Sequence, residues 1–359
     1  MRSAQPKFGV LDFCRGMAAL AVVTGHARLF TLATYSSGTA KPLWLAPLYL
    51  LTGLGRQAVV IFFVLSGFLI GRNVLNAYST GNWSWRTYAA HRLARLWAVL
   101  IPALVLTVLF DAARGEWPNL LVALANAAFL QTVAAPTFGS NAPLWSLAYE
   151  FWYYVMFPLL VLVIARRGSR KARIAAALAT IAIIIALPPI IVAYGSIWLM
   201  GVAAVALYER GKLPAVLLAV MGAVVMAGTI AGSKLVPSPS DTAIFVEDAA
   251  LGLGFALMLP RLAAGTHALG TVWLARMSYS LYLTHYPFFV FTVWALSIKP
   301  VEPDADSLLR FAGLTCAALI LAFGMYYVFE RNTPALREFL AGLFSPASRE
   351  AKHRSGQVA

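Results

Sequence analysis

The chain has 359 residues, of which 60% are hydrophobic and 12% are charged. Soluble domains have about 45–50% apolar and about 25% charged residues, so this composition excludes an ordinary soluble protein. A net charge of +14 would suggest nucleic-acid binding in a soluble chain. In a membrane protein the same excess of Lys and Arg indicates orientation instead, and no nucleic-acid partner is expected.

The first apolar run extends over about 11–34, which is longer than the hydrophobic region of a cleavable signal peptide. It also carries Asp12, Arg15 and His26, so we predict a retained membrane span. Nine further runs are predicted to be membrane-spanning helices, at 57–75, 93–110, 144–165, 172–193, 196–208, 213–231, 243–259, 272–296 and 308–329. The predicted fold is therefore all-α, a polytopic membrane bundle of about ten transmembrane helices.

The segment 118–134 is only moderately apolar, and whether it crosses the membrane decides the orientation of the chain. Cytoplasmic loops carry an excess of Lys and Arg. If this segment does not cross, 19 basic residues fall on one side and 4 on the other. If it crossed, the basic cluster 166–173 would lie opposite the basic N-terminal loop. We therefore predict a re-entrant or interfacial segment, with both termini in the cytoplasm.

Residues 1–342 are predicted to form the transmembrane domain, and 343–359 a disordered cytoplasmic tail. The two cysteines, Cys14 and Cys316, lie in predicted spans that are far apart in sequence. Neither a disulfide nor a thiolate metal site is expected from them, and no metal is predicted.

Ionisable residues inside a span are candidates for function, because a charge at mid-bilayer costs about 2.5–3.5 kcal/mol on insertion scales. Counting residues along the helices places His26, Glu150 and His285 at the middle to outer half of the bilayer. They come from three separate spans, so a pocket between helices would bring them together. A structural interpretation also exists for each, since a membrane histidine is as often a hydrogen bonder in helix packing as a catalyst.

Other charged residues in the spans have simpler interpretations. Asp12 and Arg15 are three residues apart and share a helix face, so a local ion pair explains them equally well. Glu247 and Asp248 lie close to a predicted loop and are expected to reach toward the membrane surface rather than to act in catalysis.

Five sequence blocks carry a more specific signal. They are LDFCRGMAAL at 11–20 continuing to His26, FFVLSGFLI at 62–70, the pair Arg92 and Arg95, LWSLAYE at 144–150, and SYSLYLTHYP at 278–287 followed by FER at 329–331. In this order they resemble the acyltransferase 3 group of membrane-bound acyltransferases over about 9–337. The chain has Phe151 where many members have a second acid, and Ala98 where many have a proline.

The resemblance implies transfer of an acyl group, commonly acetyl, from acyl-CoA on the cytoplasmic side of the inner membrane. The acceptor would be a hydroxyl of a glycan or glycosylated molecule. Arginine suits the CoA phosphates because its planar guanidinium can bind them with two hydrogen bonds. The residues expected to bind substrate or CoA are Asp12, Arg15, Arg92, Arg95, Ser146 and Tyr282. Arg72 and Arg86 are explained by membrane orientation alone.

His26 is the candidate general base, because an imidazole can accept the hydroxyl proton at neutral pH. Asp12 lies about 21 Å from His26 along the helix, so Arg15 is its predicted partner. Glu150 or His285 is expected to orient His26 or the acceptor, which makes His26, Glu150 and His285 the candidate catalytic residues. Direct transfer and an acyl intermediate on His26 both remain open.

Two alternatives without chemistry compete with this interpretation. A transporter also keeps ionisable residues at mid-depth, but transporter halves commonly repeat their broken helices. Here Pro188 and Pro189 break one helix and no matching break recurs. A silent acyl-CoA or glycan binder would share the arginines but has no need of His26. The histidines, the acid and the basic cytoplasmic rim together favour an acyltransferase.

Overall fold

The structure is a computed structural model that describes residues 8–35, 43–166, 168–211, 213–233, 240–265 and 272–343. All helices and turns of helix in these ranges are as follows: α1 (Gly9–Thr31), η1 (Leu43–Leu45), α2 (Ala46–Thr52), α3 (Gly55–Ser79), α4 (Trp85–Ala113), α5 (Leu120–Ala127), η2 (Ala142–Leu144), α6 (Trp145–Ile164), α7 (Arg170–Ala186), α8 (Pro189–Arg210), α9 (Ala215–Gly232), α10 (Asp241–Ala263), α11 (Val272–Arg276), α12 (Ser278–Ala295), α13 (Ala305–Val328), η3 (Glu330–Asn332) and α14 (Thr333–Leu343). The predicted all-α fold is confirmed. Of the predicted tail, everything after Leu343 lies outside the described residues.

Eight helical stretches in the described part of the chain are long and apolar enough to cross a membrane, and they contain α1, α3, α4, α6, α8, α9, α10 and α13. The other two predicted spans correspond to α7, with 17 residues, and α12, with 18. Helices of this length reach about 26 Å, which is close to the hydrocarbon thickness of a bilayer. α12 carries His285 and three tyrosines among its apolar residues.

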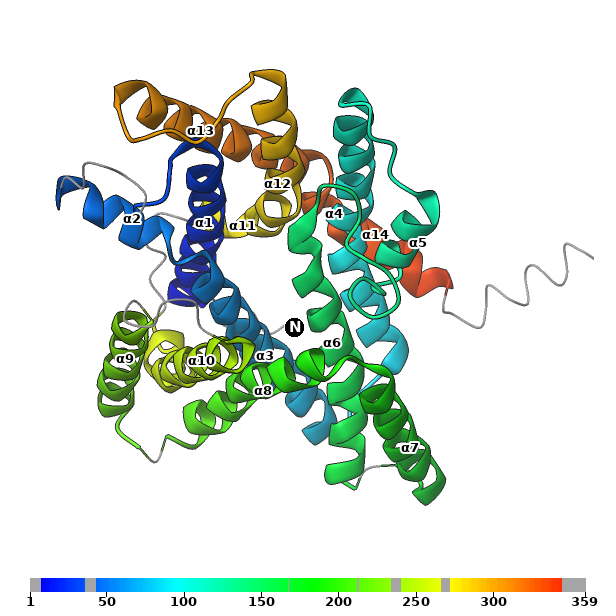
Figure 1. The fold of residues 1–359 in the computed structure, drawn as a ribbon. Helices are drawn as coiled ribbons and strands as arrows, with labels where there is room; N and C mark the ends of the chain where they lie inside the picture. Colours follow the sequence, from blue (N-terminus) through cyan, green and yellow to red (C-terminus); the bar gives the residue numbers. More distant parts are fainter. Residues whose placement is uncertain are drawn as a thin grey trace, which may run out of the picture.

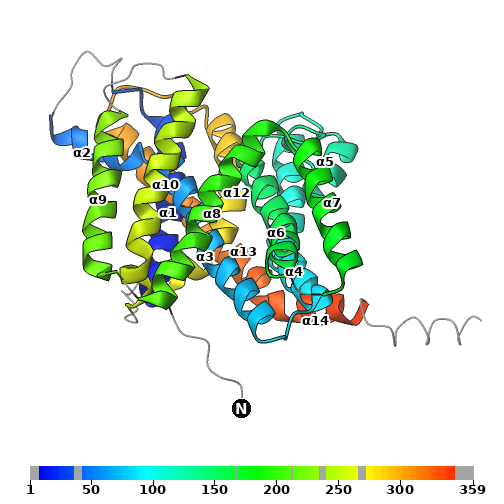
Figure 2. The same cartoon turned by 90° about the horizontal axis from the view of Figure 1, so that it is seen from below.

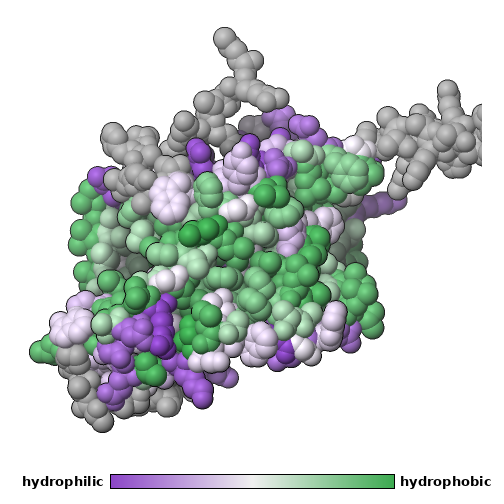
Figure 3. Space-filling view, turned by 90° about the horizontal axis from the view of Figure 1, so that it is seen from above, coloured by the Kyte–Doolittle hydropathy of each residue, from purple (hydrophilic) through white to green (hydrophobic). Residues whose placement is uncertain are grey.

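The outer surface of the bundle is apolar where lipid would contact it. Figure 3 shows a hydrophobic band across the middle of one face, with hydrophilic residues gathered at its two margins. Exposed aliphatic side chains recur along α7, for example Leu178 and Ile185, and along α9, for example Val220 and Val224. The chain is therefore an integral membrane protein whose helices present aliphatic stripes to the bilayer.

The segment 118–134 does not form a membrane-spanning helix. Its helix α5 has eight residues, so it is about 12 Å long, less than half of the hydrocarbon thickness. The chain then turns back through Phe129 and Thr132, both with positive φ. The Asn126 amide holds the turn, since its Nδ2 donates to Val122 O and Pro136 O and its Oδ1 accepts from the backbone N–H of Phe138. This agrees with the predicted re-entrant or interfacial segment.

The two ends of the bundle differ in their short helices. Figure 2 shows α2 and α5 at one end and α14 lying across the helices at the opposite end. On α14, Leu336 and Leu340 pack against Ala90 and Ala94 of α4, while Phe339 is exposed. An amphipathic helix in this position is suited to the interface between lipid and water.

A glycine in the second sequence block allows two spans to touch. A Cβ atom on Gly67 of α3 would lie 1.9 Å from the carbonyl oxygen of Trp198 on α8, and one on Gly201 would lie 2.0 Å from Val64 O. No side chain larger than hydrogen fits at either position unless the helices separate. Small residues at such crossings let membrane helices pack backbone to backbone.

Helix α1 lies between two groups of helices. It packs against α11, α12 and α13 on one side and against α3 on the other, and α3 in turn packs against α8 and α10 (Figure 1). This arrangement brings the first, second and fifth sequence blocks together at the centre of the bundle.

The acids of α10 correct one expectation. Asp248 was expected to reach toward the membrane surface, but its side chain is 2% exposed. Arg56 of α3 donates to Asp248 over 2.5 Å and to Glu247 over 2.7 Å, and the Tyr194 hydroxyl donates to the second Asp248 oxygen. Because a cation from a distant helix neutralises it, Asp248 is buried as part of an ion pair.

Candidate active site

Two histidines from distant parts of the sequence meet between α1 and α12. The Nδ1 atom of His26 lies 2.9 Å from Nε2 of His285, and the two rings meet edge to edge, with an angle of 10° between their planes and 5.2 Å between their centroids. His285 is fully buried, whereas His26 is partly exposed. Tyr286 packs edge-on against the His26 ring. The pair is therefore held rigidly, and only His26 has an accessible edge.

The hydrogen bonds of the pair fix the proton positions. The Nδ1 atom of His285 lies 2.9 Å from the carbonyl oxygen of Leu281, and a carbonyl oxygen can only accept. In a neutral imidazole the other nitrogen must then be the acceptor, so Nε2 of His285 accepts from Nδ1–H of His26. This leaves the lone pair of His26 on Nε2. A histidine oriented in this way by a second hydrogen-bonding group can take a proton from a hydroxyl.

The proline after the histidine in the fifth block explains a further contact. Pro287 has no N–H group, so the carbonyl oxygen of Leu283, four residues earlier, lacks its helical partner. The side-chain amide of Asn141, which is fully buried, donates to that oxygen over 2.9 Å. Pro158 of α6 leaves Tyr154 O free in the same way, and the Tyr88 hydroxyl donates to it over 2.9 Å. Asn141, which precedes η2, and Tyr88 of α4 thus hold α12 and α6 at their prolines.

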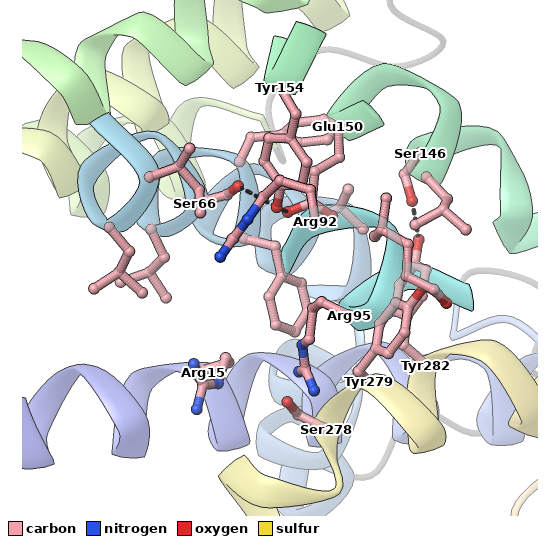
Figure 4. A pocket seen from close by; sticks show the side chains of 18 residues that line it. Arg15, Ser66, Arg92, Arg95, Ser146, Glu150, Tyr154, Ser278, Tyr279 and Tyr282 are labelled. Carbon is pink, nitrogen blue, oxygen red and sulfur yellow. Dashed lines mark hydrogen bonds between the residues drawn. The ribbon is translucent and has the colours of Figure 1, made fainter. Parts of the chain in front are cut away.

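A pocket of about 190 Å³ lies beside the histidine pair, between α1, α3, α4, α6 and α12. Figure 4 shows that Arg15 of α1 and Arg92 and Arg95 of α4 border the same space as Tyr279 and Tyr282 of α12. The other polar lining residues are Ser66, Ser146, Glu150, Tyr154 and Ser278. Six of the residues predicted from the sequence, Arg15, Arg92, Arg95, Ser146, Glu150 and Tyr282, therefore lie around one cavity.

The three arginines of the pocket differ in their partners. Arg15 forms an ion pair with Asp12 at 2.7 Å, and Arg95 forms one with Glu330 at 2.6 Å. Arg92 has no carboxylate within ion-pair distance in the described part of the chain. Its guanidinium lies instead over the rings of Tyr88 and Tyr154, at 5.9 and 5.8 Å from their centroids. Arg92 is therefore the cation of the pocket whose charge is least compensated.

Glu150 does not join the histidines, although the sequence predicts that the three residues converge. Its carboxylate accepts a hydrogen bond from the Tyr154 hydroxyl one turn later, and Tyr154 also contacts Ser66 at 3.0 Å. The partner of His26 is His285. Glu150 lines the arginine pocket instead, together with Ser66 of α3 and Arg92 of α4.

Tyr282 forms the wall between the pocket and the histidine pair. It lines the pocket, and its ring centroid lies 6.1 Å from that of His285. Its hydroxyl lies 2.7 Å from Ser146 Oγ. Ser146 Oγ also donates to the carbonyl oxygen of Pro143 over 3.3 Å. Along α1, Arg15 and His26 are separated by about 16 Å, so the pocket and the histidine pair occupy different depths.

The sequence did not single out Tyr154, Ser66 or Glu330 as members of the site. Tyr154 lies outside the five sequence blocks, and Ser66 lies inside the second block without a charge to distinguish it. Glu330 closes the last sequence block, but its place among the basic residues that follow α13 hid its contact with Arg95. The block itself was the only available signal for Glu330.

Comparison with known proteins identifies similar sequences. The model of the acyltransferase 3 family, described as an acyltransferase domain, matches residues 8–327. A Bacillus subtilis (strain 168) protein named "Putative peptidoglycan O-acetyltransferase YrhL" is 30% identical over 181 residues, which cover 46% of this chain. The match spans only 25% of the length of that protein. No solved structure matches.

Proposed function

The chain belongs to the acyltransferase 3 family and is therefore an acyltransferase of the membrane; we propose that it takes an acyl group, commonly acetyl, from acyl-CoA and transfers it to a hydroxyl of a glycan. The observation that carries the proposal is the arginine-lined pocket that Tyr282 separates from an oriented histidine pair. The similarity to a protein named as a peptidoglycan O-acetyltransferase supports a glycan acceptor.

The pocket has the chemistry of a site for a phosphate-bearing donor. Guanidinium groups bind phosphate oxygens through charge-assisted hydrogen bonds. The uncompensated charge of Arg92 suits an anionic ligand, and Tyr88 and Tyr154 hold its guanidinium in place. A cavity of about 190 Å³ accommodates a narrow arm better than a whole nucleotide. We propose that the acyl-bearing arm of the donor enters this pocket, with its phosphates at the cytoplasmic rim.

The reaction is proposed to proceed at His26. The acceptor hydroxyl would give its proton to Nε2 of His26 while its oxygen attacks the thioester carbonyl carbon. The carbon–sulfur bond then breaks, CoA leaves as a thiolate, and His26 gives the proton to the sulfur. His285 would act as a positioning residue through its hydrogen bond to Nδ1 of His26. The hydroxyl pair of Ser146 and Tyr282 lies where it could contact the acyl group.

The donor is tested most directly with purified protein and radiolabelled acetyl-CoA. We expect release of CoA that depends on an added hydroxyl acceptor, such as fragments of peptidoglycan. Absence of release with any acyl-CoA, in protein that remains folded in detergent, would contradict the proposed donor. Transport of acetyl-CoA or of an acylated product without CoA release would point to the alternative class of transporter.

Replacement of Arg92 by glutamine is expected to raise the KM for acetyl-CoA by about 10- to 100-fold, because a hydrogen bond to a charged group contributes about 1.5–3 kcal/mol. The matched control is Arg86→Gln, on the same helix but exposed and outside the pocket. KM values measured for both variants decide the question. An equal rise in the control would mean that the general positive charge of the surface, rather than the pocket, attracts the donor.

The excess of basic residues on one side of the predicted topology supports a cytoplasmic location for both termini and for the loop before α7. Ser169 is exposed in that loop. In a background in which Cys14 and Cys316 are replaced by alanine, Ser169→Cys is expected to react with a membrane-impermeant thiol reagent in inverted inner-membrane vesicles only. Labelling of the Ser169→Cys variant in intact cells with a permeabilised outer membrane would show the opposite orientation.

A further inference from the structure

Glu330 lies buried in η3, the turn that joins α13 to the amphipathic helix α14, and its side chain is 2% exposed. Both of its carboxylate oxygens are used. Oε1 accepts from Nη1 of Arg95 over 2.6 Å. Oε2 accepts from the hydroxyl of Ser280 over 2.6 Å and from the backbone N–H of Ser280 over 3.1 Å. One carboxylate thus joins α4 to α12.

Of the two residues that Glu330 holds, Arg95 belongs to the pocket, and Ser280 lies on α12 between the lining residues Tyr279 and Tyr282. Arg95 lines the pocket, and its guanidinium also lies 5.1 Å from the centre of the Tyr279 ring. The Tyr279 hydroxyl in turn donates to Leu96 O on α4. Arg95 is therefore fixed between an acid and an aromatic ring, and its rotation is restricted from two sides.

The contact with Ser280 fixes the beginning of α12. The first N–H groups of a helix have no partner within the helix, and a carboxylate there is favoured by the helix dipole. Ser280 is in the first turn of α12, which continues to Tyr282 and His285. Loss of the Glu330 contact would therefore allow the pocket wall and the histidine pair to move together.

Glu330 does not itself line the pocket, whereas Arg95 does. We propose that Glu330 is a positioning residue for the acyl donor: it acts on donor binding through Arg95, by setting the direction in which Arg95 faces the ligand, while its contact with Ser280 holds the first turn of α12 in place. The proposal rests on the proposed function for the identity of that ligand. A purely structural ion pair would stabilise the fold without changing donor binding.

The test is a double-mutant cycle of Glu330→Gln, Arg95→Gln and the combined variant, with KM for acetyl-CoA, kcat and the unfolding temperature measured for each. We expect Glu330→Gln to raise KM by about tenfold when Arg95 is present. In the Arg95→Gln background the same change should have no further effect on KM, because Glu330 acts through Arg95. The positioning role would be overturned if the increases in KM of the two single variants multiplied in the combined variant. It would also be overturned if Glu330→Gln lowered the unfolding temperature and left KM unchanged.

The matched control is the exposed ion pair between Asp306 and Arg310 on α13. Asp306→Asn should leave KM and the unfolding temperature unchanged. If Glu330→Gln fails to fold because the half-buried Arg95 is left without its carboxylate partner, Glu330→Asp replaces it in the cycle, since it keeps the charge and shortens the reach. The same criterion then applies: an increase in KM that disappears in the Arg95→Gln background supports the role, and any other result overturns it.

The cycle also separates this proposal from the proposed function. If the wild-type protein does not release CoA from acetyl-CoA, the donor assignment fails, and the cycle is run on the binding of CoA alone. Absence of coupling between the two residues in protein that does turn over would overturn the positioning role and leave the donor assignment intact.

Discussion

Alanine in place of His26 is expected to lower kcat for acyl transfer by about 10²–10⁴-fold, the contribution of a positioned general base. The hydrogen bonds of His285 leave the lone pair of His26 on Nε2, which is the accessible nitrogen of the ring. The measurement is acceptor-dependent CoA release by the purified variant. Retention of the wild-type elution profile and unfolding temperature will show that the loss is not due to misfolding.

His91 provides a matched control for this experiment. It lies on α4, remote from His26 in sequence and outside the residues that line the pocket. His91→Ala should keep wild-type turnover. Wild-type turnover by His26→Ala would instead exclude His26 as the base. Acid-quenched samples of the wild-type protein with labelled acetyl-CoA distinguish the two routes, because only an acyl intermediate on His26 leaves label on the protein and loses it in the alanine variant.

His285→Ala is expected to lower kcat on the order of 100-fold with little change in KM for the acyl donor. Without the acceptor at Nε2 of His285, nothing fixes the tautomer and orientation of His26, and a catalytic group displaced by about 1 Å can cost about 100-fold in rate. His285 is fully buried, so the variant is compared at equal amounts of folded protein.

Glutamine at the same position sharpens the test. The side-chain oxygen of glutamine accepts hydrogen bonds, so His285→Gln can still accept from Nδ1–H of His26. We expect it to recover about tenfold of the activity that alanine loses, as a hydrogen bond of about 1.4 kcal/mol would give. Equal losses in the two variants would mean that His285 fills space rather than orients His26.

The membrane fold was predictable because its signals are local. The length of an apolar run decides whether a helix can span, and the basic loops decide its direction. The count of basic residues also predicts that segment 118–134 does not cross the membrane, and α5, with eight residues, is too short to cross it. The prolines and Gly67 of the sequence blocks become interpretable only with the structure, since their partners lie on other helices.

The partners within the site were less predictable. Counting residues gives the depth of a side chain but not the direction in which its helix is rotated. Depth alone groups Glu150 with His26, whereas the rotation of α6 turns Glu150 into the arginine pocket. Asp248 was assigned to the membrane surface because its partner Arg56 is 192 residues away in the sequence. Glu330 was hidden for the same reason, with Arg95 on a helix far earlier in the chain.

The hydrogen bond from His285 to Leu281 O also decides the electrical character of the proposed reaction. A backbone carbonyl cannot pass a proton onward, so the pair offers no path through His285. In the proposed reaction, the proton that His26 takes from the acceptor therefore leaves from Nε2 and passes to the sulfur of CoA. If the acceptor lies on the outer side, each acyl group that moves outward is exchanged for one proton that moves inward. The acyl group replaces the hydroxyl proton and therefore counts formally as a cation of charge +1. Its exchange for a proton moves no net charge across the membrane, so the membrane voltage neither drives nor opposes it.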